Sequence, residues 1–235
     1  SGDANADSDG EARLWSSILN QDWSVDIWGE IARRYNSEIW VGGYDLLNEP
    51  VHYNGRQVRE LQKRMSERIR EFDKNHILFV NGNYWSRAFE DLVPKFDDNM
   101  VWAFHYYSWM VNAPVSKNTI QYLIDLRINT NTPLWLGETG ENSNEWFVQL
   151  RTLIEQNNIG WAWWNYKKIG TINAPVSSPT DPVYQEILNY WGGSGSKPNF
   201  DRSLLGLNNM VENLKFKNCD LRKDVVASLL SKDFQ

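Results

Sequence analysis

Cysteine, long apolar runs and clusters of positive charge are all scarce in this sequence of 235 residues. Its only cysteine, Cys219, cannot form an internal disulfide, which excludes a disulfide-stapled scaffold. No apolar run approaches the roughly 20 residues of a membrane span, so we expect no transmembrane segment. Thirty acidic residues outnumber 24 basic ones and no run of Lys or Arg stands out, so we expect no nucleic-acid partner.

The beginning of the chain lacks an initiator methionine and a signal segment. It starts Ser1-Gly2, and we therefore expect a processed or truncated start. Residues 1–10 are small and acidic without periodicity, which predicts a flexible loop or a cleaved end. The length suits one α/β domain with a sizeable core or two small domains, and we favour a single domain over residues 1–235.

Aromatic residues, in contrast, are abundant, with 13 Trp and 10 Tyr. Packing in the core accounts for about half of them in our interpretation, because aromatic side chains contribute strongly to cores. The others need a reason to lie at the surface. Sugar rings have apolar C–H faces and polar edges that match a flat indole, so the surplus favours a carbohydrate ligand.

Apolar segments with strand and helix patterns alternate along the chain. Amphipathic periodicity predicts helices near 15–35, 57–75, 120–128 and 146–154, and apolar runs predict strands at 39–50, 76–80, 100–105, 133–140 and 159–164. Strand ends roughly 25 to 33 residues apart are typical of successive βα units in a parallel barrel or doubly wound sheet. Beyond Trp164 we expect a long loop over 171–182 and closing helices at 203–214 and 224–230.

Five βα units are too few for a closed barrel, which needs eight strands. No strand is predicted before Ile39, so the first three or so βα units of an eight-stranded barrel are missing from this sequence. Without them the outermost strands would expose unpaired edges. We expect an N-terminal barrel segment to be supplied from outside this chain, as a cleaved fragment or by another copy of the chain.

Two of the predicted strands end in a glutamate. The run IWVGGYDLLNEP places Asn48 and Glu49 at a strand exit, where Pro50 stops the pairing, and PLWLGETG places Glu138 at another exit. In parallel α/β folds, side chains at the carboxyl ends of strands face the crevice where chemistry occurs. Two carboxylates facing each other across such a crevice are what glycoside hydrolysis requires.

These motifs together resemble glycoside hydrolase family 5, the cellulase family of retaining (β/α)8 barrels. The resemblance covers about residues 15–191 and is carried by Asn48-Glu49-Pro50, His105-Tyr106-Tyr107, Gly137-Glu138 and Trp164, each at a strand exit. It implies that the chain carries strands 4 to 8 of the barrel. The family also places an Arg and a His on earlier strands, and neither has a counterpart here.

The resemblance also implies roles for individual residues. Glu49 would be the general acid/base and Glu138 the nucleophile, while Asn48 would hydrogen-bond the sugar 2-hydroxyl. His105 and Tyr107 would hold and tune the two carboxylates. Trp164 would form the floor of the subsite on the nonreducing side of the cleaved bond.

Other readings of individual residues compete with these roles. A glutamate at a strand end can simply cap a helix or pair with an arginine, and Glu141 and Glu145 are rivals for the role of Glu138. We interpret His52 and His76 as structural, with His52 the better placed to touch sugar. Packing and a sugar platform are equally open for Trp85, Trp109 and Trp146. No metal-ligand spacing such as HExxH occurs, so we expect no catalytic metal and no cofactor.

The sequence thus predicts a retaining, endo-acting hydrolase whose partner is a polysaccharide, with β-1,4-glucan such as cellulose as the first substrate. Mixed-linkage glucan, xyloglucan, mannan and β-1,3-glucan are alternatives. A different class of function is a carbohydrate-binding barrel fragment that has lost turnover, which the absent front strands would favour. We expect a bacterial type of protein that acts outside the cell, at the cell surface or in the periplasm.

Overall fold

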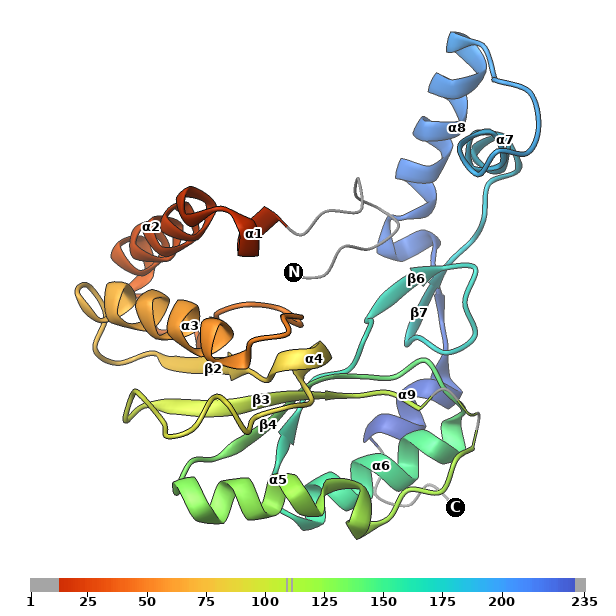
Figure 1. The fold of residues 1–235 in the computed structure, drawn as a ribbon. Helices are drawn as coiled ribbons and strands as arrows, with labels where there is room; N and C mark the ends of the chain where they lie inside the picture. The colour runs from red at the N-terminus through yellow and green to blue at the C-terminus, as the bar shows by residue number, and fades with distance from the viewer. Residues whose placement is uncertain (1–12, 109, 111, 231–235) are drawn as a thin grey trace. The chain divides into compact units, whose positions relative to one another are not determined.

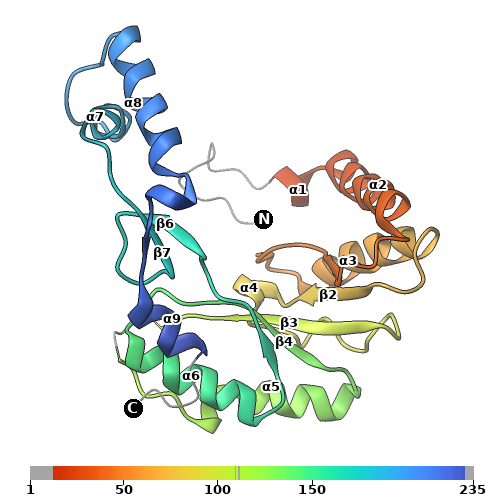
Figure 2. The same ribbon diagram turned by 180° about the vertical axis from the view of Figure 1, so that it is seen from behind.

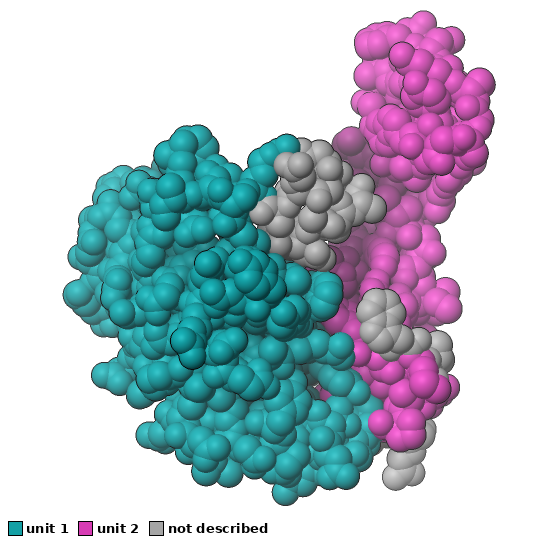
Figure 3. Space-filling model, in the orientation of Figure 1, with its two compact units in different colours: residues 1–106, 115–139, 153–162 teal, residues 107–114, 140–152, 163–235 magenta. Residues whose placement is uncertain are grey.

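The chain divides into two compact units, which Figure 3 colours separately. The computed structural model describes residues 13–108, 110 and 112–230, so the prediction for residues 1–10 lies outside the described residues. Unit 1 extends to Tyr106 and also contains Val115–Thr139 and Leu153–Ala162. Unit 2 contains Tyr107–Pro114, Gly140–Thr152 and the chain from Trp163 onward. A single catalytic domain over 1–235 stays a prediction.

Unit 1 alternates strands and helices, as the sequence predicts. Its elements are α1 (Arg13–Ser16), α2 (Ile18–Tyr35), β1 (Gly43–Asp45), α3 (Gly55–Arg70), β2 (Ile77–Asn81), α4 (Asn83–Ser86), β3 (Met100–Tyr106), α5 (Lys117–Thr130), β4 (Leu134–Thr139) and β5 (Gly160–Trp161). Helix α6 (Asn144–Gln156) begins in unit 2 and ends in unit 1.

The five strands of unit 1 form one parallel sheet in the order β1-β2-β3-β4-β5. Each strand pairs with the next one along the chain, which is the arrangement of successive βα units. Because all the pairings are parallel, the carboxyl ends of the five strands lie at one edge of the sheet. Both ribbon views show α2 stacked on α3 (Figures 1 and 2).

The core of unit 1 lies between this sheet and its helices. Helix α3 contributes an apolar stripe whose fully or almost fully buried members are Val58, Leu61, Met65 and Ile69. Strand residues such as Leu78 and Phe104 are buried as well. Trp102 is fully buried and its Nε1 donates a hydrogen bond of 3.0 Å to Thr130 Oγ1 on α5. Packing thus accounts for part of the aromatic surplus.

The first predicted strand is shorter than its apolar run. Ile39 and Trp40 are 84% and 88% exposed and precede the strand, which begins only at Gly43. Local hydrogen bonds hold this segment in a turn, because the Trp40 amide donates to the Glu38 side chain and the Val41 amide donates to the Glu38 carbonyl. Such local bonds compete with a strand ladder. The predicted strand over 39–50 is therefore wrong at both ends, since β1 begins at Gly43 and ends at Asp45, four residues before Glu49.

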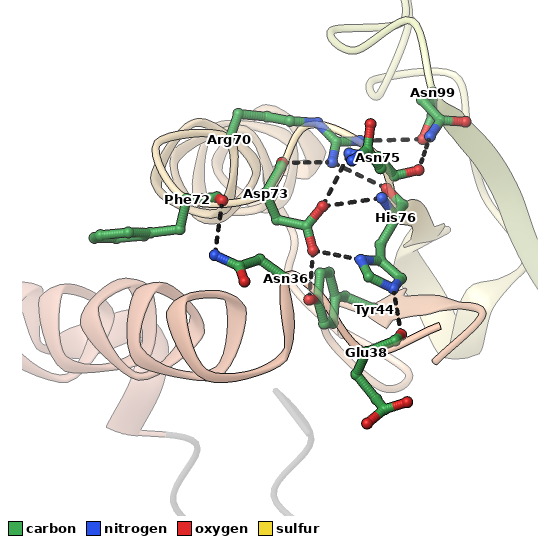
Figure 4. Close-up of polar contacts among 9 residues, drawn as sticks. All are labelled: Asn36, Glu38, Tyr44, Arg70, Phe72, Asp73, Asn75, His76 and Asn99. Atoms are coloured by element: carbon green, nitrogen blue, oxygen red, sulfur yellow. Dashed lines mark hydrogen bonds and ion pairs between the residues drawn. The ribbon is translucent and has the colours of Figure 1, made fainter. Parts of the chain in front are cut away.

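A buried polar cluster lies at the amino-terminal ends of β1 and β2, opposite the strand exits (Figure 4). Asp73 is fully buried and accepts hydrogen bonds from Tyr44 Oη at 2.7 Å and from the backbone amides of Asn75 and His76. His76 contacts the Asp73 carboxylate through Nδ1 and the Glu38 carbonyl through Nε2. Burial raises the pKa of Asp73, but these hydrogen bonds outweigh it and hold the pKa at about 2.

Unit 2 contains a small sheet and further helices. Its elements are β6 (Lys167–Ile169), β7 (Val176–Ser178), α7 (Pro182–Trp191), α8 (Phe200–Asn213), the 3-10 helix η1 (Phe216–Asn218), β8 (Asp220–Leu221) and α9 (Lys223–Leu230). The two predicted closing helices are confirmed as α8 and α9. Strand β7 lies inside the predicted loop and α7 was not predicted, although Asp181 caps its start with a hydrogen bond to the Tyr184 amide.

Each unit exposes apolar side chains on one of its helices. Helix α2 exposes Ile18, Leu19, Trp23 and Ile27, and α8 exposes Phe200, Leu204, Leu207 and Val211. Strand β1 pairs only with β2 within the part of the chain that the structure describes, so its other edge is open there. Among the described helices, none is both long and apolar enough to cross a membrane.

Candidate active site

Glu49, His105 and Glu138 come together at the carboxyl ends of β1, β3 and β4. His105 Nδ1 lies 2.8 Å from Glu49 Oε1 and 3.7 Å from Glu138 Oε2. One ligand atom from each of the three side chains lies within 4.8 Å of the other two. The His105 side chain is 2% exposed, whereas the two carboxylates are 25% and 23% exposed. The carboxylates thus have access to solvent above a buried imidazole.

A register shift between β3 and β4 aims Glu138 at His105. Phe104 pairs with Leu136, but the next pair is His105 with Glu138, so Gly137 is an extra residue on β4. Because side chains alternate along a strand, an inserted residue changes which face the following side chain occupies. This irregularity puts Glu138 directly opposite His105.

Gly137 also lets the imidazole lie close to β4. A Cβ atom at this position would be 3.1 Å from His105 Nε2 and 3.3 Å from its Cδ2. Contacts this short are tighter than most Cβ contacts, so the ring would have to shift by a few tenths of an ångström. The glycine that the sequence places before Glu138 therefore fixes the position of His105 as well.

Hydrogen bonds hold the segment that carries Glu49 at the end of β1. Trp28 Nε1 donates to the Leu46 carbonyl at 2.9 Å, and the Asn83 side chain bonds both the amide and the carbonyl of His52. Glu49 itself has a φ of 45°, a left-handed conformation that non-glycine residues rarely adopt. Such strain costs about 1–3 kcal/mol and is typical of functional sites. The chain on both sides of Glu49 is thus anchored.

Asp45 is a further carboxylate near this site that sequence reasoning missed. Asn81 donates a hydrogen bond of 2.6 Å to Asp45 Oδ1, and Ser86 Oγ donates one of 2.6 Å to Asn81 Oδ1. Desolvation by surrounding protein atoms raises the pKa of Asp45, although the residue keeps contact with solvent. The Asn81 hydrogen bond and the charge of His105 lower this pKa, and the charge of Glu138 raises it. The sequence signal that could have identified Asp45 as a site residue is its position as an acidic residue inside an apolar strand run.

The other predicted site residues have different outcomes. Asn48 is exposed beside Glu49, and Trp85 is 46% exposed on α4 of unit 1. Tyr107 and Trp164 belong to unit 2, so the expected contact of Tyr107 with the carboxylates and the expected subsite floor at Trp164 stay predictions. Trp109 lies outside the described residues.

Three residues with competing readings are also located. Trp146 is fully buried, so the packing interpretation holds and a sugar platform at this position is wrong. Glu141 forms an ion pair with Lys168 in unit 2. Glu145 lies in the first turn of α6, where an acidic side chain is favourable. Neither glutamate belongs to the group around His105 in unit 1.

The grouped donors could also bind a cation, because two carboxylates and one imidazole are common ligands of divalent metals. The sequence prediction of no catalytic metal stays a prediction. Sugar hydrolysis by paired carboxylates needs no metal, since proton transfer and nucleophilic attack supply the chemistry.

The chain is similar to several proteins of known type. A model of the family described as "Cellulase (glycosyl hydrolase family 5)" matches residues 4–170. Endoglucanase C of Acetivibrio thermocellus is 25% identical over 223 residues, which cover 70% of this chain and 64% of that protein. The chain therefore spans slightly less than two thirds of the length of this relative.

Solved structures show the same fold. Cel5A of Thermotoga maritima, in complex with cellobiose, superposes with a TM-score of 0.63 at 17% identity and covers 93% of this chain and 69% of its own. Cellulose synthase subunit Z of Clostridioides difficile superposes with a TM-score of 0.59 at 18% identity, with coverages of 90% and 68%. The five parallel strands are thus part of a (β/α)8 barrel. Since the family model matches well over half of the sequence, the chain belongs to glycosyl hydrolase family 5, the cellulase family.

Proposed function

We propose that this protein is a retaining, endo-acting hydrolase of β-1,4-glucan. The observation that supports this most strongly is the meeting of Glu49 and Glu138 at His105, with one oxygen of each carboxylate within 4.8 Å of the other. Retaining glycosidases need their carboxyl groups about 5 to 5.5 Å apart, whereas inverting enzymes need about 6.5 to 9.5 Å to admit a water. The short separation supports direct attack by one carboxylate.

In the first step, the Glu138 carboxylate attacks the anomeric carbon and the bond to the glycosidic oxygen breaks. Glu49, in its acid form, gives its proton to that leaving oxygen. In the second step, the Glu49 carboxylate takes a proton from water, and the water oxygen displaces Glu138 from the sugar. His105 Nδ1 lies close to both carboxylates and would hold them in position relative to each other through the two steps.

The substrate proposal rests on the family and on the relatives named above. Asn48 would bind the 2-hydroxyl, and exposed Trp85 and Trp164 would offer flat apolar faces to sugar rings. The proposal of endo action rests on the relatives, whose printed names are endoglucanases. We propose that the protein works outside the cell, where such polymers occur.

Substitution of the two glutamates tests this proposal. We expect Glu138→Gln to abolish release of reducing ends from carboxymethylcellulose while binding of cellohexaose is kept. Glu141→Gln is the matched control, because Glu141 lies three positions further on and pairs with Lys168. Proton NMR of the first product should give the β-anomer. Equal activity of Glu138→Gln and the parent protein, or an α-anomer as first product, would contradict the proposal.

We further propose that a polypeptide supplying the front strands completes the barrel, as an N-terminal fragment or another copy of the chain. Three observations support it: the edge of β1 that is unpaired among the described residues, the exposed apolar faces of α2 and α8, and the part of the relative that this chain does not cover. An unpaired parallel edge strand is disfavoured in a stable monomer. Native mass spectrometry of the active species tests this. Full activity in a species with the mass of one 235-residue chain would contradict it.

A further inference from the structure

A groove on unit 1 lies apart from the residues proposed for catalysis. It has a volume of about 670 Å³ and runs between the segment after α4 and helix α5. Neither Glu49, His105 nor Glu138 lines it. Its size falls within the roughly 300–1,000 Å³ of ligand pockets. The groove therefore has room for several sugar rings.

The walls of this groove are anchored on both sides. On one side, Arg59 Nε donates to the Leu92 carbonyl at 3.0 Å, and its NH2 group donates to the Pro94 carbonyl at 3.0 Å. The other wall is α5, which buries Ile120 and Leu123 in the core. Because both walls are fixed, the groove is preformed and a ligand would lose little free energy in ordering it.

The groove combines an apolar surface with an aromatic ring. Phe89 and Leu126 contribute buried and half-buried surface, while Val93 and Tyr122 are 38% and 46% exposed. An exposed tyrosine presents an apolar ring together with a polar hydroxyl. This pairing matches the apolar faces and hydroxyl edges of β-linked sugars.

The polar rim distinguishes among ligands. Glu90, Asp125 and Asn129 are exposed along the rim, and one Asp125 oxygen accepts a hydrogen bond from Gln121. The rim's lysine, Lys95, pairs with Asp98 at 3.0 Å. The two carboxylates of the lining face one lysine, and the cationic side chains of Arg59 and Arg87 lie nearby, so the charge of the groove does not select for an anionic ligand. The carboxylates supply hydrogen-bond acceptors for hydroxyl groups, so a neutral polyhydroxylated ligand fits this rim.

From this geometry we infer that the groove between residues 89–95 and α5 is a second binding site for a neutral β-linked glucan chain, separate from the hydrolytic site. The inference rests on the proposed function in that the same polymer would occupy both sites. Binding a long chain at a second site raises its effective concentration at the first. The gain applies to polymers and not to short substrates.

NMR titration of the 15N-labelled Glu138→Gln protein with cellohexaose tests this inference, because this variant should not consume the ligand. We expect amide shifts over residues 122–130 that saturate with a Kd on the order of 1 mM, about −4 kcal/mol. Tyr122→Ala should weaken binding at the groove roughly tenfold, about 1.4 kcal/mol. Tyr35→Ala is the matched control, since Tyr35 is 42% exposed on α2 of the same unit, and it should leave the Kd unchanged.

The same spectra report separately on the proposed function through the amides near residues 49 and 138. Shifts at both regions support both proposals, and shifts at residues 122–130 alone support only the groove. Absence of shifts at residues 122–130 overturns the groove proposal, whatever happens at the carboxylates. If Tyr122→Ala does not fold, Asn129→Ala replaces it, and an unchanged Kd at the groove in that variant overturns the proposal.

Discussion

His105 Nδ1 contacts Glu49 Oε1 at 2.8 Å, and the same nitrogen is 3.7 Å from Glu138 Oε2. A single buried imidazole thus joins two carboxylates that are 89 positions apart in the sequence. Through this contact His105 orients Glu49, whose proposed role alternates between acid and base. His105 is therefore a positioning residue.

Replacing this imidazole tests that role. We expect His105→Ala to lower kcat/KM on cellohexaose by about 100-fold, because removal of a preorganised polar contact at a reacting group costs this much in other enzymes. The pH profile should change shape as well, since Glu49 loses its neighbour. A variant with lower activity but the parent's pH profile would show that His105 has only a structural role.

The glycine before the nucleophile gives a second prediction. Gly137→Ala should displace the His105 ring, because the new Cβ would lie 3.1 Å from Nε2. We expect a loss of about 1–3 kcal/mol in the free energy of unfolding, measured with urea, and a lower kcat. Gly42→Ala is the control, since no atom lies within 4 Å of a Cβ there. Equal behaviour of the two variants would contradict this account of the site.

Sequence patterns could predict the strand exits that carry Glu49, His105 and Glu138, because the apolar runs and the residues that end them are local signals. The approach of both glutamates to His105 Nδ1 depends on the extra residue at Gly137. The alternation of apolar and polar residues in the sequence does not reveal this extra residue. The prediction that Trp40 lies in a buried strand was wrong, because a turn held by the Glu38 side chain leaves Trp40 exposed. Helix α7 was missed, although Asp181 before Pro182 is a recognisable start signal.

Asp73 should make the stability of the protein sensitive to acid. Its folded pKa of about 2 lies below the ordinary value near 4, so the carboxylate stabilises the fold above pH 4. This stabilisation, about 2 kcal/mol, is lost as the pH falls from about 4 to 2. We expect Asp73→Asn to lose it at neutral pH, as measured by urea unfolding. Asp98→Asn, at a fully exposed side chain, should match the parent protein.

If Asp73→Asn and the parent protein unfolded at the same urea concentration at pH 7, the hydrogen bonds to this carboxylate would not stabilise the fold. Tyr44→Phe offers a milder test of the same cluster. It removes one hydrogen bond to Asp73 and should cost about 1 kcal/mol.

Asp45 should influence the pH dependence of hydrolysis. Its negative charge and that of Glu138 disfavour each other, as the effect of Glu138 on the Asp45 pKa indicates. In Asp45→Asn the proposed nucleophile loses a neighbouring negative charge, so the acidic limb of the profile of kcat/KM against pH should move to lower pH. Movement to higher pH, or none, would mean that Asp45 acts only through its hydrogen bond to Asn81.

The most direct measurement of the central claim is to trap the covalent intermediate. A 2-deoxy-2-fluoro cellobioside with a good leaving group should form a stable ester with the nucleophile, because the fluorine slows both steps while the good leaving group speeds only the first. Peptide mass spectrometry should then find one added fluorocellobiosyl group on Glu138, and Glu138→Gln should remain unlabelled. Attachment to Glu49 or Glu141, or turnover of the parent protein without any label on Glu138, would contradict the account.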